Sequence, residues 1–387
     1  MLTKLILNLD AIRSNLEYFE SRCGGPGRVI PVLKCNGYEM GAAQIASALV
    51  GTDVSAACVA NVDEGVALRN AGCDIDLLVF APIASYHDDA IEACIEHNLQ
   101  PTLGSPVGLK RFELACQKDP ALRGQLNLDI GMNRYGWRPT PQELQAMNLE
   151  NVKGNLSGAY SHVPFHSDAS RMTDAISDFK ANSATFNISR HVASTMVAAN
   201  LPTDVLSQFE HTRIGLGLFG LLPNHCCTEV KSKLIPAIKF ETKVTAVRTI
   251  QSGSGISYDH DFVSQSKAEI ATIPVGYNHG LVANASGKLE FEINGQVAKQ
   301  VGRITMDSCM LDVTGVPSVS AGDSVKLLDH ESKCSTADDW CDAMKCSSWE
   351  LLVALGKANS IEYVEADQGK VFTKNQVGLA SDTGRMA

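Results

Sequence analysis

The sequence predicts an α/β protein: an N-terminal (β/α)8 barrel of the TIM type, followed by a mostly β C-terminal domain. Between about residues 29 and 220, short apolar runs alternate with segments of helical periodicity, a pattern typical of parallel strands joined by helices. After Leu222 and Pro223, alternating apolar and polar residues separated by glycines indicate antiparallel strands. A length of 387 residues allows each domain a core of its own.

Strand-like runs and the helical segments between them carry the barrel prediction. Asp10 is the expected cap of an introductory helix, and helical spacing recurs over 62–71 and 87–98. A doubly wound sheet would give the same alternation and stays open at this point. The eight expected strands are Val29–Leu33, Ala56–Ala60, Asp76–Phe80, Leu99–Leu103, Gln125–Asp129, Leu156–Tyr160, Asp204–Ser207 and Arg213–Phe219.

The second domain is expected to span residues 231–387 and the barrel residues 1–230. Strands are expected at Phe240–Arg248, Lys288–Ile293 and Ser324–Leu328, with helices near Thr336–Met344 and Ser348–Ala358. Residues 1–9 alternate in polarity like a strand and can pair with the C-terminal domain.

Composition excludes several classes of protein. The net charge of −10 disfavours nucleic-acid binding, and the absence of an apolar run of 18 residues disfavours a membrane span. The first ten residues are too quickly interrupted for a secretory signal, so we expect a cytoplasmic protein. The twelve cysteines lack Cys-x-x-Cys pairs, and His162 with His166 lacks further ligands, so no metal site is expected.

The first predicted barrel strand ends in a lysine. The segment reads Val32-Leu-Lys34-Cys-Asn-Gly-Tyr38-Glu-Met-Gly41. Because barrel enzymes carry their chemistry at the carboxyl ends of strands, this amine is placed where a nucleophile is used. Partial burial lowers the pKa of such an amine and favours attack on an aldehyde, although a lysine that merely extends to solvent would look the same.

Further polar segments follow the later strands. An arginine offers a planar fork to a carboxylate, and hydroxyls at a helix start suit a phosphate. The segments are Asp129-Ile-Gly-Met-Asn-Arg134, Ser161-His162, His191-Val-Ala-Ser194-Thr195, Arg213-Ile-Gly215-Leu216, Gly276-Tyr277-Asn278-His279-Gly280, Val301-Gly-Arg-Ile-Thr-Met306-Asp307 and Ser348-Trp349-Glu350.

In order and spacing, these segments resemble the motifs of the alanine racemase family over nearly the whole chain. The resemblance implies pyridoxal 5'-phosphate held as a Schiff base on Lys34. It assigns Arg213 to the pyridine nitrogen, where decarboxylase relatives place a carboxylate, so a decarboxylase is disfavoured. It implies that the cofactor is further contacted by Tyr38, His162, Ser194, Thr195, Gly215, Leu216 and Trp349.

The same resemblance implies the reaction, an interconversion of L- and D-alanine by two bases on opposite faces of the substrate. Lys34 and Tyr277 would be the bases, and His162 would orient the tyrosine. Arg134 and the backbone N–H of Met306 would hold the substrate carboxylate. The family's head-to-tail homodimer would bring Tyr277 to the partner's cofactor.

The sequence departs from the family at several positions. Many members carry a carbamylated lysine where this chain has Asn127, so our hypothesis is that a small anion such as chloride takes its place beside Arg134. Ser194 replaces an asparagine, Trp349 a tyrosine, and Asn278 with His279 an alanine and an aspartate. Two alternatives therefore stay open. One is a broad-specificity racemase acting on serine, lysine or arginine, and the other is a cofactor-binding protein without turnover.

Overall fold

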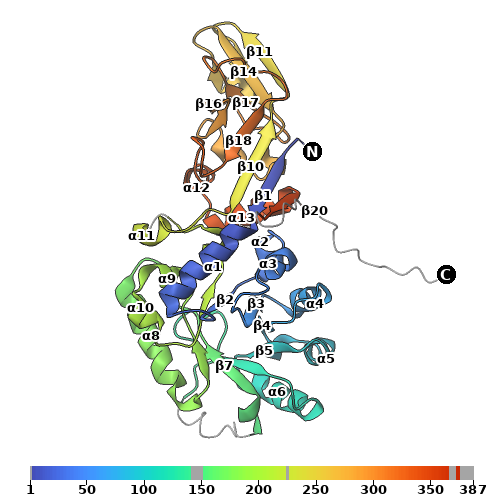
Figure 1. The fold of residues 1–387 in the computed structure, drawn as a ribbon, viewed down its shortest axis with the longest axis vertical. Coiled ribbons are helices and arrows are strands. Elements are labelled where there is room, and N and C mark those ends of the chain that lie inside the picture. Colours follow the sequence, from blue (N-terminus) through green and yellow to red (C-terminus); the bar gives the residue numbers. More distant parts are fainter. Residues whose placement is uncertain (1, 141–150, 224–225, 366–371, 375–387) are drawn as a thin grey trace, which may run out of the picture. The chain divides into compact units, whose positions relative to one another are not determined.

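The chain is described by a computed structural model over residues 2–140, 151–223, 226–365 and 372–374, and it divides into two compact units. The barrel unit comprises residues 11–235, and the β unit comprises residues 1–10 with residues 236–387 (Figure 1). Each unit is described by itself below.

Eight parallel strands close into a ring in the barrel unit. Six of them form a sheet in the order β3 to β8, and β2 pairs with β9. Bridges between Val32 and Cys58 and between Ser194 and Arg213 join the two sets at both edges. The predicted (β/α)8 barrel is thereby confirmed. The strands are β2 (Val29–Pro31), β3 (Ala56–Val59), β4 (Asp76–Pro82), β5 (Leu99–Leu103), β6 (Gly124–Asn127), β7 (Leu156–Tyr160), β8 (Ser189–His191) and β9 (Thr212–Ile214).

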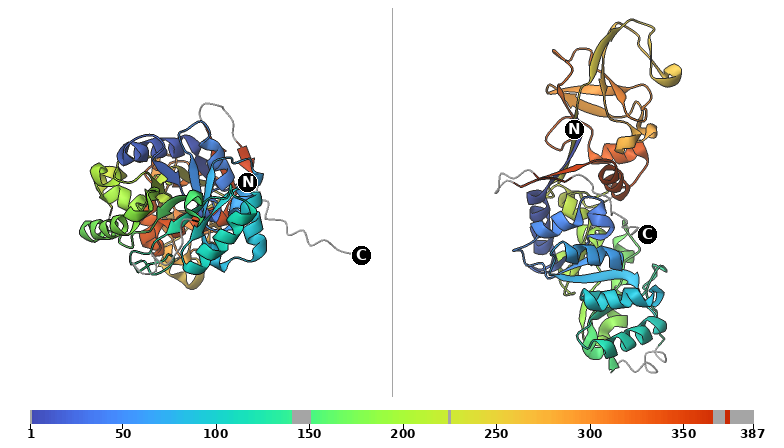
Figure 2. Two further views of the ribbon diagram at one scale, coloured as in Figure 1. Left: turned by 90° about the horizontal axis from the view of Figure 1, so that it is seen from below. Right: turned by 90° about the vertical axis from the view of Figure 1, so that its right-hand side faces the viewer.

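Helices lie around the outside of these strands (Figure 2). Side-chain caps start several of them: the oxygens of Asn61, Ser105 and Asp168 accept a backbone N–H of α4, α6 and α8. The helices are α1 (Leu9–Cys23), α2 (Lys34–Tyr38), α3 (Ala42–Ala48), α4 (Val62–Asn70), α5 (Asp88–Glu96), α6 (Pro106–Lys118), α8 (Ala169–Ser183), α9 (Thr195–Asn200), α10 (Thr203–Leu206) and α11 (Thr228–Lys231), with short 3-10 turns η1 (Ile83–Ser85), η3 (Lys153–Asn155), η4 (Ala184–Phe186) and η5 (Leu216–Phe219).

Three local predictions were wrong. The strand expected at Asp204–Ser207 is the helix α10, which begins directly after Pro202. The strand in its place is β8, a short run whose polar side chains hid it from a hydrophobicity pattern. The last expected strand stops at Ile214, and η5 follows because Gly215 turns the backbone out of the extended conformation.

The start of α1 also differs from the expectation. Asp10 lies inside the first turn of the helix, and its backbone N–H donates to the side-chain oxygen of Asn8 at 2.9 Å. Asn8 therefore supplies the side-chain oxygen at this helix start, the task that the sequence assigned to Asp10.

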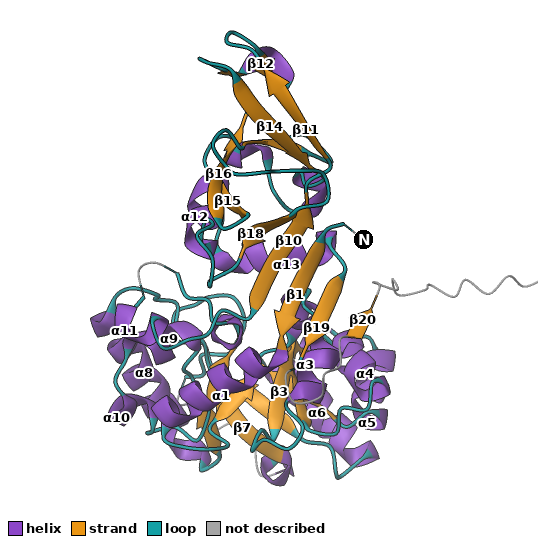
Figure 3. Ribbon diagram, turned by 45° about the horizontal axis from the view of Figure 1, so that its top comes forward, coloured by secondary structure: helices purple, strands orange, loops and turns teal. Residues whose placement is uncertain are grey.

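The β unit is built on one ten-stranded, mostly antiparallel sheet (Figure 3). Its order is β11-β14-β17-β16-β15-β18-β10-β1-β19-β20. The strand β1 pairs with β10 and β19, so the opening residues of the chain belong to this sheet. The strands are β1 (Lys4–Asn8), β10 (Ile238–Lys243), β11 (Ala246–Ile250), β14 (Ala268–Ile273), β15 (Glu290–Ile293), β16 (Gln296–Val301), β17 (Cys309–Asp312), β18 (Ser324–Leu328), β19 (Ile361–Val364) and β20 (Phe372–Lys374), beside the separate pair β12 (Gly255–Ile256) and β13 (Phe262–Val263).

Among its described residues, the β unit also contains two helices and three short 3-10 turns. They are α12 (Ala337–Met344), α13 (Ser348–Ala358), η6 (Tyr258–His260), η7 (Tyr277–His279) and η8 (Ala283–Ala285). Trp340 of α12 is fully buried against the rings of Phe240 and Phe291. The run expected as one strand at Phe240–Arg248 is divided between β10 and β11. Over the residues that the structure describes, no helix is long and apolar enough to cross a bilayer.

The barrel unit offers a direct test of how α1 is attached. The buried amide of Asn15 donates to the carbonyls of Leu218 and Ile235 and accepts from the N–H of Ile235. Replacing Asn15 by Leu leaves these backbone groups unsatisfied, so we expect a loss of about 2–4 kcal/mol in the free energy of unfolding. The control is Asn182→Ala, whose amide bonds, among the residues that the structure describes, only to Asp178 on its own helix. Equal melting temperatures for the two variants would contradict this reading.

Candidate active site

Lys34 begins a left-handed turn at the carboxyl end of β2. The φ angles of Cys35, Asn36, Gly37, Tyr38 and Glu39 are 53°, 50°, 64°, 58° and 65°. Four of these residues are not glycine, and left-handed backbone costs such a residue roughly 1–2 kcal/mol. The turn therefore needs external support, and it holds the half-buried Lys34 in one place.

That support comes from two side chains. One carboxylate oxygen of Glu64 accepts the N–H of Cys35 at 2.9 Å, and the other accepts the N–H of Ala60 at 2.8 Å. The side chain of Asn36 accepts the N–H of Ala42 at 3.0 Å, which closes the far end of the turn. Glu64 was missed from the sequence. Its signal was the Asn61-x-x-Glu64 pattern of a helix start, here used to clamp a neighbouring loop.

The phenol of Tyr38 lies against the backbone at the end of β9. A Cβ built on Gly215 would come within 2.1 Å of the Tyr38 hydroxyl oxygen, so only glycine permits this approach. The ring packs edge-on against Phe219 at 5.7 Å. Burial raises the pKa of Tyr38, so its hydroxyl stays protonated and can donate to an anion.

Thr195 joins this corner from the start of α9. Its buried hydroxyl oxygen accepts the N–H of Gly215 at 3.0 Å and that of Gly217 at 3.4 Å. Ser194, the preceding residue, forms the backbone bridge to Arg213. Three kinds of group therefore lie close together here: the hydroxyls of Tyr38 and Thr195, the backbone N–H groups of Gly215 and Gly217, and the first turn of η5, which begins at Leu216. This donor set suits a phosphate.

Arg213 is buried inside the ring of strands. One terminal nitrogen donates to Nδ1 and to the carbonyl oxygen of His191, both at 2.8 Å, and the other donates to the carbonyl oxygen of Ser161 at 2.5 Å. The guanidinium carbon lies 5.2 Å from the centre of the Tyr160 ring, which adds a cation–π contact. Two carbonyl oxygens, a ring nitrogen and an aromatic face therefore hold this guanidinium in one orientation.

His162 lies among cationic side chains just beyond β7. Burial, with the charges of Arg213, Arg134 and Lys34, lowers the pKa of His162 to about 3. Its imidazole is consequently neutral at physiological pH, so one ring nitrogen carries a proton and the other can accept a hydrogen bond.

The loop after β6 carries Arg134. The Asp129 carboxylate accepts the N–H groups of Gly131 and Asn133 at 3.2 and 3.0 Å, which shapes the loop. Arg134 is exposed and its guanidinium carbon lies 5.8 Å from the ring centre of Tyr135. Asn127 is buried at the end of β6, opposite Tyr160 in the register of β6 and β7. The predicted anion beside Arg134 stays a hypothesis.

The remaining predicted residues belong to the β unit. Tyr277 begins η7 and is half exposed, and its N–H donates to the carbonyl of Thr305 at 3.1 Å. A Cβ on Gly276 would come within 2.1 Å of that same carbonyl oxygen, so glycine allows the two loops to touch. Met306, also exposed, follows Thr305, and its carbonyl accepts the N–H of Asn278 at 2.9 Å. Trp349 lies separately on α13, partly buried.

Cys58 is a buried group that the sequence did not single out for the site. It lies on β3 under the electrostatic influence of Arg213 and Lys34, and burial raises the pKa of its thiol to about 12. A neutral thiol in this position adds no charge beside the two cations.

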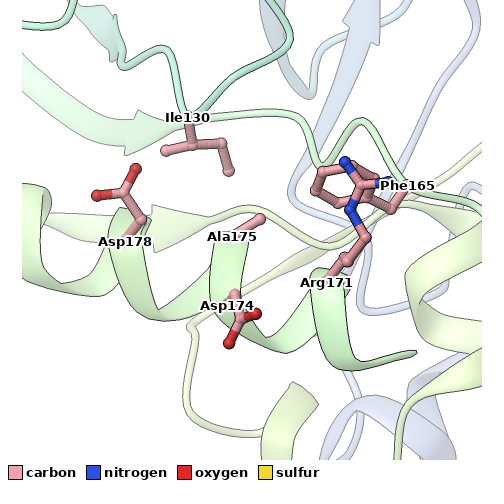
Figure 4. A pocket seen from close by; sticks show the side chains of 6 residues that line it. All are labelled: Ile130, Phe165, Arg171, Asp174, Ala175 and Asp178. Carbon is pink, nitrogen blue, oxygen red and sulfur yellow. The ribbon is translucent and has the colours of Figure 1, made fainter. Parts of the chain in front are cut away.

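A surface hollow lies beside α8 (Figure 4). It has a volume of about 260 Å³, and Arg171 stacks on Phe165 at 3.9 Å along its wall. No predicted site residue is among those that line it, which are Ile130, Phe165, Arg171, Asp174, Ala175 and Asp178.

Comparison with known proteins agrees with both units. The sequence matches the model of the alanine racemase N-terminal domain over residues 7–223 and that of the C-terminal domain over residues 237–363. An alanine racemase from Synechocystis is 31% identical over 354 residues, covering 88% of this chain and 93% of that protein. One from Nostoc is 30% identical over 361 residues, covering 89% and 92%.

Solved structures show the same fold. An alanine racemase from Streptomyces lavendulae superposes with a TM-score of 0.81 at 25% identity, covering 95% of this chain and 98% of that one. One from Bartonella henselae, described with covalently bound pyridoxal phosphate, gives 0.81 at 23% identity, covering 94% and 100%. The chain therefore belongs to the alanine racemase family.

Proposed function

We propose that this protein is a pyridoxal-phosphate-dependent racemase that interconverts L- and D-alanine. The observation that carries the proposal is the meeting, in the barrel unit, of a lysine amine on a braced left-handed turn with a phosphate-type donor set and a buried arginine. Family membership supports the same reaction.

The residues present fit the cofactor. Tyr38 can reach the backbone at the end of β9 only because Gly215 has no side chain, so a hydroxyl donor is already placed beside the N–H groups there. Thr195, Ser194 and Leu216 would complete the phosphate site, with Trp349 as a further donor through its indole N–H. Arg213 would donate to the pyridine nitrogen, and Lys34 would hold the aldehyde carbon. Bound there, pyridoxal phosphate supplies an electron sink that acidifies the Cα–H bond of an amino acid.

Two bases then move the proton. The Lys34 amine, released once the amino group of the substrate has taken its place, would take or return the Cα proton on one face of the substrate, and the Tyr277 phenol would do so on the other. Neutral His162 would accept a hydrogen bond from Tyr277 and thereby orient it. Racemisation follows because a proton removed on one face can be returned on the opposite face.

Substrate binding is assigned to Arg134 and Met306. The exposed guanidinium of Arg134 can hold a carboxylate bidentately, and the backbone N–H of Met306 would add a second contact. Asn127 precedes this arginine by seven residues in the sequence, and the hypothetical anion would bind between the two side chains. This part of the pocket decides which amino acids fit.

We further propose a homodimer in which each site draws Tyr277 and Met306 from the partner subunit. The support for this arrangement is the resemblance to the alanine racemase family, whose dimer packs head to tail. We place the protein in the cytoplasm, because all twelve cysteines are free thiols and a reducing compartment keeps them so.

The function is tested with the purified chain, loaded with pyridoxal phosphate, in heavy water. L- and D-alanine should each reach an equal mixture with deuterium at Cα, and serine, lysine and arginine should react more slowly. Faster turnover of one of these three would assign a broad-specificity racemase. Cofactor binding without any exchange would assign a binding protein and overturn the proposal.

Replacing Tyr277 by Phe removes the second base while keeping the ring. We expect kcat for alanine to fall by about 100- to 10,000-fold in both directions, the usual contribution of a positioned acid–base group. The visible absorbance of the bound cofactor should be retained, because Lys34 is unchanged. Racemisation at more than a tenth of the wild-type rate would remove Tyr277 from the mechanism.

Gly215→Ala tests the proposed phosphate site. The new methyl group would overlap the Tyr38 hydroxyl, so the tyrosine must move and its hydrogen bond to the phosphate is lost. We expect the cofactor to bind about tenfold more weakly or worse, since a hydrogen bond to a charged group contributes about 1.5–3 kcal/mol. Fluorescence titration of the cofactor-free protein measures this. Gly154→Ala, which meets no atom within 4 Å, is the control, and equal affinities would reject the assignment.

A further inference from the structure

A chain of hydrogen bonds crosses the interior of the barrel from Arg213 to the protein surface. Arg213 donates to Nδ1 of His191 at 2.8 Å, and Nε2 of His191 lies 2.6 Å from the side-chain oxygen of Gln125. The Gln125 amide nitrogen donates to the oxygen of Gln100 at 2.8 Å. The Gln100 amide nitrogen donates to the carboxylate of Asp76 at 2.9 Å.

The two ends of this chain fix its direction. A guanidinium can only donate and a carboxylate can only accept, so each link must donate away from Arg213 and towards Asp76. The two glutamine amides have no freedom to turn over, because a reversed amide would set two donors or two acceptors face to face. All members except the exposed Asp76 are buried, so water cannot repair a reversed link.

The direction of these hydrogen bonds decides which ring nitrogen of His191 carries the proton. Burial and the charge of Arg213 hold the pKa of His191 well below its ordinary range, so the ring carries a single proton. Gln125 presents an oxygen to Nε2, which places that proton on Nε2 and leaves Nδ1 as the acceptor for Arg213. If the proton were on Nδ1 instead, that N–H would face an N–H of the Arg213 guanidinium, and neither could accept.

We propose that Gln125, Gln100 and Asp76 are positioning residues that hold His191 as its Nε2–H form and, through His191, orient the Arg213 guanidinium. The inference rests on the proposed function in one respect, the role of Arg213 at the pyridine nitrogen. None of the three touches the cofactor site. They act through a histidine that keeps a donor-only side chain aimed in one direction.

The chain offers a matched control. Ser157 donates its hydroxyl to the same Gln100 oxygen at 2.8 Å, but it lies on a branch outside the path to Arg213. Removing it costs a partly buried hydrogen bond to the same residue and leaves every link of the path in place. If the substitutions merely loosened the barrel interior, Ser157→Ala and the path variants would show the same changes. If the path holds His191 in one form, only a substitution of Gln125, Gln100 or Asp76 should change that form.

The experiment uses the full chain loaded with pyridoxal phosphate and labelled with ¹⁵N-histidine. Two-bond ¹⁵N–¹H spectra report which ring nitrogen is protonated, and His191→Asn assigns the signals of His191. We expect an Nε2–H ring with a slowly exchanging proton in the wild type and in Ser157→Ala. Gln125→Leu should lose that slow exchange, shift the visible absorbance of the cofactor, and lower kcat on the order of tenfold, with KM for alanine unchanged.

A second variant guards against misfolding. If Gln125→Leu does not fold, Gln100→Leu, which does not touch His191, should give the same changes in weaker form. An Nδ1–H ring in the wild type would overturn the proposal. So would unchanged His191 signals and cofactor absorbance in the folded path variant, or equal changes in Ser157→Ala. A wild type that fails to racemise alanine would reject the proposed function instead, because the histidine signals are read without turnover.

Discussion

The buried charge of Arg213 is the constraint on which the rest of the barrel site depends. Taking a guanidinium out of water costs several kcal/mol, which is recovered only when its donors are satisfied in good geometry. Here the acceptors are the carbonyls of Ser161 and His191 and the ring nitrogen of His191. They sit at or just beyond the carboxyl ends of neighbouring strands. The charge is therefore stable only if the strands close in this register.

The closure of the ring of strands also depends on Arg213. Ser194 and Arg213 form the bridge that joins β8 to β9, so the residue that carries the charge also holds the two sheets together. Directly after it, Gly215 and Thr195 build the corner against Tyr38. The opposite bridge, from Val32 to Cys58, leads into the left-handed turn of Lys34. The amine, the phosphate-type corner and the arginine are thus consequences of one closed set of strands.

Much of the fold and of the candidate site could be predicted from the sequence. The predictions that failed show where a hydrophobicity pattern is not informative. Lys34, Arg213 and Tyr277 stand in motifs that are modest one by one and informative through their shared order and spacing. The strand β8 could not be found, because its inward side chains are polar and satisfied by partners far along the chain. The run Asp204–Ser207 looked like a strand because three or four residues cannot distinguish the two periodicities.

Residues that support the site were harder to predict than residues that form it. Glu64 clamps the turn of Lys34 through backbone N–H groups, and Gln125 and Gln100 act across strands. Such roles depend on which backbone groups the fold leaves unpaired, and a linear motif does not contain that information. The departures at Asn127 and Trp349 were visible in the sequence, but a linear motif does not show how they change the shape of a pocket.

The central claim, that the two bases of each site come from two copies of the chain, is tested most directly by mixing two inactive variants. Lys34→Ala and Tyr277→Phe each lack one base. When they are unfolded and refolded together, the mixed dimer should contain one intact site, assembled from the wild-type lysine of one subunit and the wild-type tyrosine of the other. Alanine racemisation should then recover to about a quarter of the wild-type rate for random pairing. No recovery in dimers shown to be mixed would contradict the account.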